Sequence, residues 1–154
     1  MLKHFVRIAA TLGLVLQFGV AAAASLVSGA DSGAAIGGYD PVAYFLDGKP
    51  TRGSADITTQ WNGATWRFVS AEHRDKFVEM PEKFAPQYGG YCAYATAHGS
   101  VAKGDGAQWK IVDGKLYLNN NWFAQKLWQA DVPGNIEDSE RKWPEVRTKI
   151  EAKR

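Results

Sequence analysis

Cys92 and His98 lie six residues apart and, together with His73, are the side chains best suited to bind a metal ion. Thiolate sulfur and imidazole nitrogen are ligands that soft or borderline ions such as copper and zinc prefer. The six-residue step does not form a chelate by itself, because it spans about 20 Å on a strand and turns by about 600° on a helix. The sequence therefore predicts a transition-metal site with Cys92 and His98, which requires a bend in the chain or a ligand from His73.

The same three residues also have structural interpretations. Cys92 lies in a run of alanines and tyrosines, where a free cysteine is often a small buried apolar residue. His73 would be the third residue of a helix capped by Ser70, where a solvated or capping role fits. A thiol enzyme, with Cys92 as nucleophile and His98 as base, is a further alternative. No resolving cysteine or nucleophile motif accompanies Cys92, so we expect no catalysis.

Aromatic residues indicate a second function of a different class. The chain has six Trp, six Tyr and seven Phe, and most of these rings should fill the core. If several of them line one cleft, they can stack on a small molecule or on a protein partner. The alternative prediction is therefore a binding module without a metal. The candidate rings are Trp61, Trp66, Trp109, Trp122, Trp128, Trp143, Tyr88, Tyr91, Tyr94 and Tyr117.

The elements that must position these residues are two β-hairpins, each followed by a helix. Asn62-Gly63 and Asp113-Gly114 each separate two apolar stretches, and such dipeptides favour the positive φ angles of a two-residue turn. Ser70 caps the first helix, which ends before Pro81. The repeated order indicates a weak internal repeat and predicts an α+β fold. The predicted strands are 57–61, 64–68, 109–112 and 115–118, and the predicted helices are 71–80 and 122–130.

Three further segments complete the predicted fold. Asp40 should cap a short helix that begins with the proline after it, since proline needs no hydrogen-bond partner at that position. The Gly89-Gly90 pair predicts a close backbone turn that presents Cys92. The chain from residue 135 has apolar residues at helical spacing and predicts a C-terminal helix that is interrupted at Pro144.

Residues 1–24 are typical of a signal peptide. Lys3 and Arg7 precede an apolar run that ends in four alanines, which suits cleavage after Ala24. The run is shorter than the roughly 20 residues of a membrane span, so we expect no stable membrane anchor after cleavage. These features predict a periplasmic or secreted protein. Residues 25–37 are small and weakly patterned and predict a flexible lead-in, so the domain would comprise residues 38–154.

Charge and cysteine content restrict the expected partners. The chain has 18 Lys and Arg against 16 Asp and Glu, a net charge of +2, so no nucleic-acid partner is expected. One cysteine cannot close an intrachain disulfide, but it can join two copies through a disulfide or a shared ion. The expected partners are a metal ion or small ligand and, in a possible homodimer, a second copy of the chain.

Several short motifs lie in a fixed order between about residues 37 and 145. They are Tyr39-Asp40-Pro41-Val42-Ala43-Tyr44, Trp66-Arg67-Phe68, Pro81-Glu82-Lys83-Phe84, Tyr88-Gly89-Gly90-Tyr91-Cys92-Ala93 and Asp113-Gly114-Lys115-Leu116-Tyr117-Leu118-Asn119. Together they resemble the YHS domain family, in its exported single-domain bacterial branch. The resemblance implies a small metal-associated module, related to cysteine-bearing domains beside heavy-metal and copper transport proteins, and it favours copper. Where those domains carry cysteines, this chain has Ala43, Val69 and His73.

Overall fold

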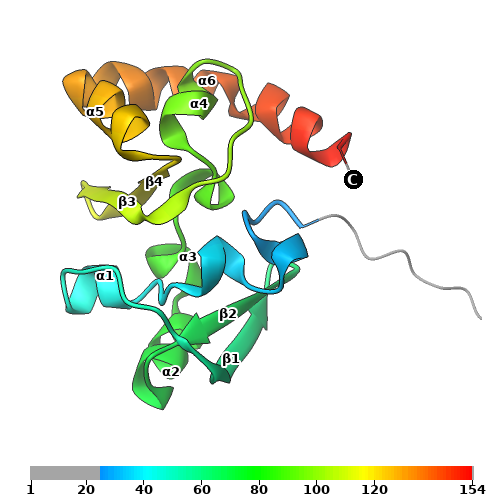
Figure 1. Ribbon diagram of the computed structural model, residues 1–154, viewed down its shortest axis with the longest axis vertical. Helices are drawn as coiled ribbons and strands as arrows, with labels where there is room; N and C mark the ends of the chain where they lie inside the picture. The colour runs from blue at the N-terminus through cyan, green and yellow to red at the C-terminus, as the bar shows by residue number, and fades with distance from the viewer. Residues whose placement is uncertain (1–24, 154) are drawn as a thin grey trace, which may run out of the picture.

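Two antiparallel β-hairpins, each followed by a helix, form the framework of the computed structural model, which describes residues 25–153 (Figure 1). This arrangement confirms the predicted α+β fold. The framework elements are β1 (Ser54–Trp61), β2 (Ala64–Phe68), α2 (Ala71–Glu79), β3 (Asp105–Val112), β4 (Lys115–Asn119) and α5 (Trp122–Ala130). The other helices are α1 (Ala43–Leu46), α3 (Pro81–Phe84), α4 (Ala93–Ala97) and α6 (Val132–Glu151), with 3-10 turns at Ala30–Ser32, Ala35–Gly38 and Gln87–Gly90.

Both hairpins close through two-residue turns, as the sequence predicts. In each hairpin the last residue of the first strand pairs with the first residue of the second, so only Asn62-Gly63 and Asp113-Gly114 remain in the turns. The φ angles are 51° and 72° in the first turn and 50° and 73° in the second. Asn, Asp and Gly tolerate this left-handed conformation better than other residues, so these dipeptides fix the register of the strands.

The two hairpin–helix units repeat one another in length and position. β1 begins at residue 54 and β3 at residue 105, a shift of 51 (105 − 54), and the same shift relates β2 to β4 and α2 to α5. A 3-10 turn with a left-handed residue precedes each unit, with φ 45° at Ile36 and 54° at Tyr88. We call residues 35–84 the first repeat and residues 87–135 the second repeat. Their matching geometry gives structural support to the weak repeat in the sequence.

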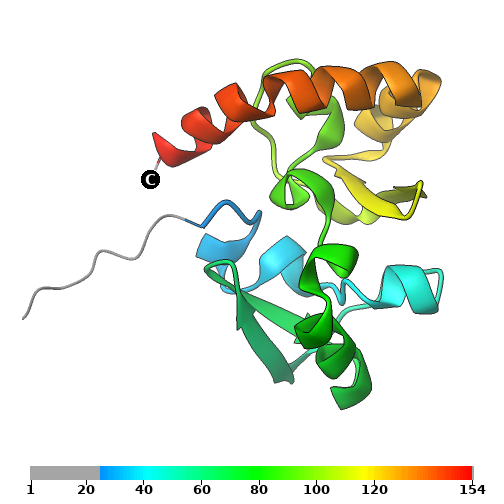
Figure 2. The same ribbon diagram turned by 180° about the vertical axis from the view of Figure 1, so that it is seen from behind.

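The chain after each framework helix differs between the repeats. In the first repeat α3 ends after one turn, whereas the equivalent helix in the second repeat, α6, continues for 20 residues (Figure 2). α6 passes through Pro144 without the interruption that the sequence predicts. Beyond the proline, Val146 and Ile150 are buried and pack against Tyr91, and this contact stabilises the last turns. No helix in the described part of the chain, α6 included, is long and apolar enough to cross a bilayer.

Residues 25–37 are packed into the domain, so the prediction of a flexible lead-in is wrong. Val27 and Ile36 are each 1% exposed and belong to the main core. The segment is tied to the second repeat by a hydrogen bond from the backbone N–H of Ser28 to the carbonyl of Gly89, at 2.8 Å. Its small residues resemble a linker in composition, but here they let the backbone approach its neighbours closely.

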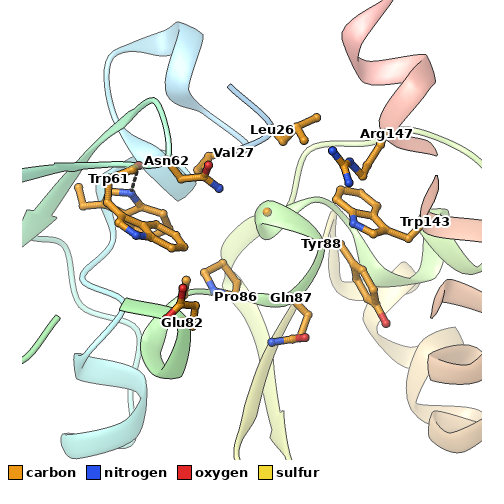
Figure 3. A pocket seen from close by; sticks show the side chains of 13 residues that line it. Leu26, Val27, Trp61, Asn62, Glu82, Pro86, Gln87, Tyr88, Trp143 and Arg147 are labelled. Atoms are coloured by element: carbon orange, nitrogen blue, oxygen red, sulfur yellow. Dashed lines mark hydrogen bonds between the residues drawn. The ribbon is translucent and has the colours of Figure 1, made fainter. Parts of the chain in front are cut away.

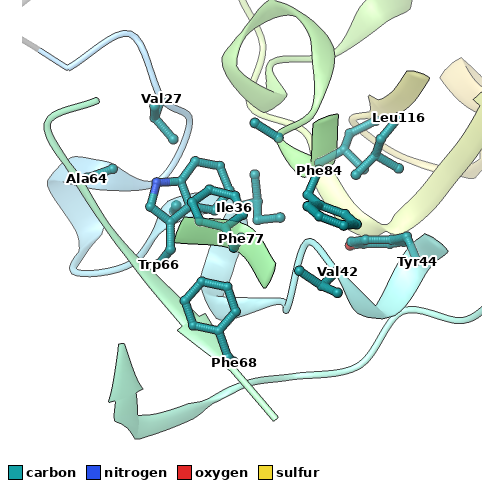
Figure 4. Packing of buried hydrophobic residues seen from close by; sticks show 13 residues of the cluster. Val27, Ile36, Val42, Tyr44, Ala64, Trp66, Phe68, Phe77, Phe84 and Leu116 are labelled. Atoms are coloured by element: carbon teal, nitrogen blue, oxygen red, sulfur yellow. The ribbon is translucent and has the colours of Figure 1, made fainter. Parts of the chain in front are cut away.

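One hydrophobic core joins the two repeats (Figure 4). Trp66 and Phe77 of the first repeat pack in the same cluster as Leu116 and Leu118 of β4. Phe77 in α2 and Trp128 in α5 occupy equivalent positions, 51 residues apart (128 − 77), and both are fully buried. Each repeat therefore uses its helix in the same way, to cover its hairpin with a large aromatic ring.

Tyr44 of α1 also connects the repeats. Its hydroxyl donates a hydrogen bond to the carbonyl of Gly106 in β3 at 2.7 Å, and its ring lies 5.2 Å from the ring of Trp109. Gly106 must be a glycine, because a Cβ atom there would lie 2.3 Å from the ring of Tyr39. The interface between the repeats is thus closely packed on this side.

Candidate functional site

Cys92 is buried and caps a helix. It is 1% exposed and precedes α4, where its sulfur accepts a hydrogen bond from the backbone N–H of Ala95 at 3.4 Å. The thiol donates to the Oδ1 atom of Asn119 at 3.6 Å. Asn119 is itself fully buried and donates from Nδ2 to Gln125 at 2.6 Å. The sulfur is therefore part of a closed network of hydrogen bonds, and its burial does not suit a disulfide to a second copy of the chain.

The two histidines that the sequence combines with Cys92 are engaged elsewhere. His98 ends α4, donates from Nδ1 to the carbonyl of Tyr94 at 2.8 Å, and packs its ring 4.4 Å from the ring of Tyr94. His73 lies in α2 of the first repeat and donates from Nδ1 to Asp40 at 2.8 Å. The three residues do not form a cluster. Between residues 25 and 153, no group of three or more His, Cys, Asp or Glu side chains is arranged to hold a metal ion.

Asp40 is a buried polar residue, and the sequence predicts only part of its role. It is fully buried, and its Oδ1 atom accepts hydrogen bonds from the backbone N–H groups of Val42 and Ala43, as predicted for a cap. Its Oδ2 atom accepts from the N–H of Val69 and from His73. The carboxylate therefore ties α1, β2 and α2 together, and His73 takes a structural role beside it.

Asp40 and Cys92 are equivalent residues of the two repeats. They are 52 positions apart (92 − 40), each lies one residue after a tyrosine that makes an isolated β-bridge, and each caps the helix that follows. In the repeat, this position holds a side chain that accepts hydrogen bonds from the free N–H groups of a helix. The equivalence gives Cys92 a structural role as a helix cap.

A groove between the first repeat and α6 brings together aromatic residues from distant parts of the chain (Figure 3). It has a volume of about 490 Å³. Trp61 at the end of β1 lines one side, and Tyr88 and Trp143 line the other. Leu26 of the N-terminal segment also contributes. The sequence includes all three aromatic residues among its candidate rings, but it does not show that these three meet.

The Trp61 side of the groove is held by packing and one hydrogen bond. Trp61 is half-buried, and its carbonyl accepts a hydrogen bond from Nε1 of Trp66 at 3.0 Å. The ring of Trp61 stands edge-on to the ring of Phe77, with centroids 5.7 Å apart. One part of the Trp61 ring is thus fixed by the core, while the rest remains accessible from the groove.

The opposite side is fixed by α6. The rings of Tyr88 and Trp143 lie 5.6 Å apart, and the hydroxyl of Tyr88 donates to Glu140 at 3.1 Å. Burial, and then the nearby Glu140 carboxylate, raise the pKa of Tyr88 well above its usual value. The Tyr88 hydroxyl therefore stays protonated further into the alkaline range than an exposed tyrosine, and it holds the ring in place as a hydrogen-bond donor.

The N-terminal segment also lines the groove, through Leu26 and Val27. Gly89 has φ 61°, and a Cβ atom there would lie 1.9 Å from the carbonyl oxygen of Leu26, so only glycine allows this contact. The hydroxyl of Ser25 donates to the carbonyl of Asn62 at 3.0 Å and joins the segment to the first hairpin turn. The N-terminal segment and most of α6 lie outside the repeats, and they contribute Leu26, Val27, Trp143 and Arg147 to the groove, while most of its other lining residues belong to the repeats.

The chain matches no protein-family model, no curated protein and no solved structure.

Proposed function

We propose that the protein is a non-catalytic binding module that takes a small ligand with a flat apolar body into the groove between Trp61 and Trp143. The observation that carries the proposal is that these two half-buried indoles, from distant parts of the chain, line one cavity. Half-buried aromatic rings offer a stacking surface at little cost in conformational entropy, because the core already holds them. A volume of about 490 Å³ is in the range of small-molecule sites.

The predicted transition-metal site does not fit the arrangement of its residues. A site for copper or zinc needs sulfur and nitrogen ligands about 2.0–2.3 Å from one ion. Here the sulfur of Cys92 is enclosed, and the Nδ1 atoms of both imidazoles donate to oxygen acceptors in different parts of the fold. We therefore base the proposed function on the groove and not on a metal.

Two further proposals come from the sequence alone. The motifs around Asp40, Cys92 and Gly114 support a relationship to the YHS family, and the pattern of residues 1–24 supports export to the periplasm or secretion. The leader lies outside the described residues. Both proposals are compatible with an extracytoplasmic protein that binds a small ligand.

Calorimetric titration with indole, a flat and uncharged probe, tests the proposed function. We expect saturable binding to the purified protein and loss of that binding in Trp61→Ala and in Trp143→Ala. Trp122→Ala is the matched control, because Trp122 is 64% exposed on α5 and does not line the groove. Since Trp143 also packs in the core, the melting temperature of each variant must be measured. Folded Trp61→Ala and Trp143→Ala proteins that bind indole as well as the Trp122→Ala control would refute the proposal.

A further inference from the structure

The groove carries opposite charges on its two sides (Figure 3). Glu82 lies in the first turn of α3, on the side of Trp61, and Arg147 lies one helical turn after Trp143 in α6. Both side chains are exposed. The described residues give neither of them a hydrogen bond or an ion pair, and the two do not pair with each other.

Arg147 differs in this respect from the other basic residues in the same part of α6. Arg141 pairs with Asp138, and Lys149 pairs with Glu145. Lys142 donates to the carbonyl of Ala97 at 2.7 Å. Arg147 has Glu151 four residues further along the helix, but no ion pair joins them. Its guanidinium group is thus available at the edge of the groove.

We propose that the groove binds a small zwitterion with a flat apolar body, with its acidic group at Arg147 and its ammonium group at Glu82. This inference rests on the proposed function, because the apolar body takes the place between the two indoles. A guanidinium group binds carboxylate or phosphate through two parallel hydrogen bonds. Glu82 on the opposite side attracts an ammonium group and disfavours a purely anionic ligand. Because Glu82 and Arg147 lie on opposite sides of the groove, the two charged groups of this ligand must lie at opposite ends of its apolar body.

Four probes that share the indole ring separate the contributions of the ammonium group and of the acidic group to the binding affinity. Indole has no charged group, tryptamine has only an ammonium group, indole-5-carboxylate has only a carboxylate, and 5-carboxytryptamine has both, at opposite ends of the ring. We expect 5-carboxytryptamine to bind more tightly than either singly charged probe, by about two- to fivefold for each ionic contact, since exposed ion pairs contribute modestly. We also expect this preference to decrease as the salt concentration rises, because salt screens exposed charges.

Charge-neutral variants assign each contact. Arg147→Gln should reduce the affinity for 5-carboxytryptamine and indole-5-carboxylate but leave the affinity for tryptamine unchanged. Glu82→Gln should reduce the affinity for 5-carboxytryptamine and tryptamine but leave the affinity for indole-5-carboxylate unchanged. Lys126→Gln and Glu79→Gln are the matched controls, because both residues are exposed and lie outside the groove.

The outcomes distinguish this inference from the proposed function. If all four probes bind with equal affinity, or if neither groove variant alters the preference, the zwitterion inference is wrong and the groove remains a site for flat apolar ligands. If none of the probes binds, indole included, both proposals are wrong. The inference is supported only if 5-carboxytryptamine binds most tightly and each groove variant removes the preference for its own charged group.

Discussion

Cys92 and Asp40 show how residue type and residue role can diverge. By type, a lone cysteine near a histidine indicates metal binding or thiol chemistry. By position in the repeat, Cys92 is a helix cap equivalent to Asp40, and its sulfur is enclosed by Asn119 and the backbone of α4. Burial and hydrogen-bond partners decide between these alternatives, and neither is visible in the sequence.

The capping role of Cys92 leads to a prediction for metals and stability. Cys92→Ala should bind copper and zinc as weakly as the unaltered protein, because the sulfur belongs to no ligand cluster among residues 25–153. The variant should lose about 1 kcal/mol in the free energy of unfolding, a typical cost of removing a cap. Parallel metal titration and denaturant unfolding measure both quantities. A stoichiometric metal site that disappears with Cys92 would contradict this account.

Tyr44 predicts the behaviour of the protein at alkaline pH. Burial raises the pKa of its hydroxyl far above the usual value, so the folded state binds the proton more tightly than the unfolded state. The resulting contribution to stability is complete below about pH 10 and decreases as the pH rises further toward the raised pKa.

Tyr44→Phe tests this contribution. The variant should lose about 1–2 kcal/mol at pH 8, because the carbonyl of Gly106 loses its buried donor. Its stability should then fall less steeply than that of the unaltered protein between pH 10 and 11.5. Denaturant unfolding at several pH values measures both effects. Parallel stability curves for the two proteins would show that Tyr44 does not titrate as described.

At the scale of elements, local signals predict local structure well. The Asn62-Gly63 and Asp113-Gly114 turns and the Ser70 cap occur as predicted, because each depends on the conformation of a few neighbouring residues. The segment 25–37 and the passage of α6 through Pro144 are predicted wrongly. Both depend on packing against distant residues, which overrides composition and helix propensity.

The sequence predicts aromatic residues that could line a groove, but it does not predict which of them meet. Trp61, Tyr88 and Trp143 are aromatic residues that the sequence analysis names, but their meeting depends on the length of α6 and on the path of the N-terminal segment. The four-residue spacing of Trp143 and Arg147 is the one local signal that was missed. On a helix this spacing places a ring and a cation on the same face.

Gly89 and Gly114 provide a matched test of how the groove is held. Both have positive φ angles, 61° and 73°, but a Cβ atom meets the carbonyl of Leu26 only at Gly89 and finds nothing within 4 Å at Gly114. Gly114→Ala should cost about 1 kcal/mol from backbone strain alone. Gly89→Ala should cost clearly more and should also weaken indole binding, because it displaces the N-terminal segment. If Gly89→Ala and Gly114→Ala changed the free energy of unfolding equally and the affinity for indole equally, the role given to the contact between Gly89 and Leu26 would be contradicted.

At the scale of the whole molecule, the protein combines a symmetric framework with an asymmetric site. The two repeats share a hydrophobic core and have matching turns, bridges and caps. The additional length of α6 and the segment before residue 35 have no counterpart within the other repeat. These unique parts complete a groove whose other lining residues come mostly from the repeats, and this is where we place the function.

The proposed export makes a prediction about the mature chain. Cleavage after Ala24 would leave Ser25 at the N-terminus, two residues before the buried Val27. Mass spectrometry of the protein recovered from the periplasm or medium of an expressing bacterium should give the mass of residues 25–154. An intact leader, or recovery only with the cell interior, would contradict export.

The most direct test of the groove is an NMR titration that observes the indole N–H groups of the protein. The chain has six tryptophans, and each gives one such signal. As indole is added, we expect the signals of Trp61 and Trp143 to shift together and to saturate at the same probe concentration, while the signals of Trp109 and Trp122 stay in place. Shifts confined to Trp122, or no saturable shift at Trp61 and Trp143, would contradict the claim that these two rings form a ligand site.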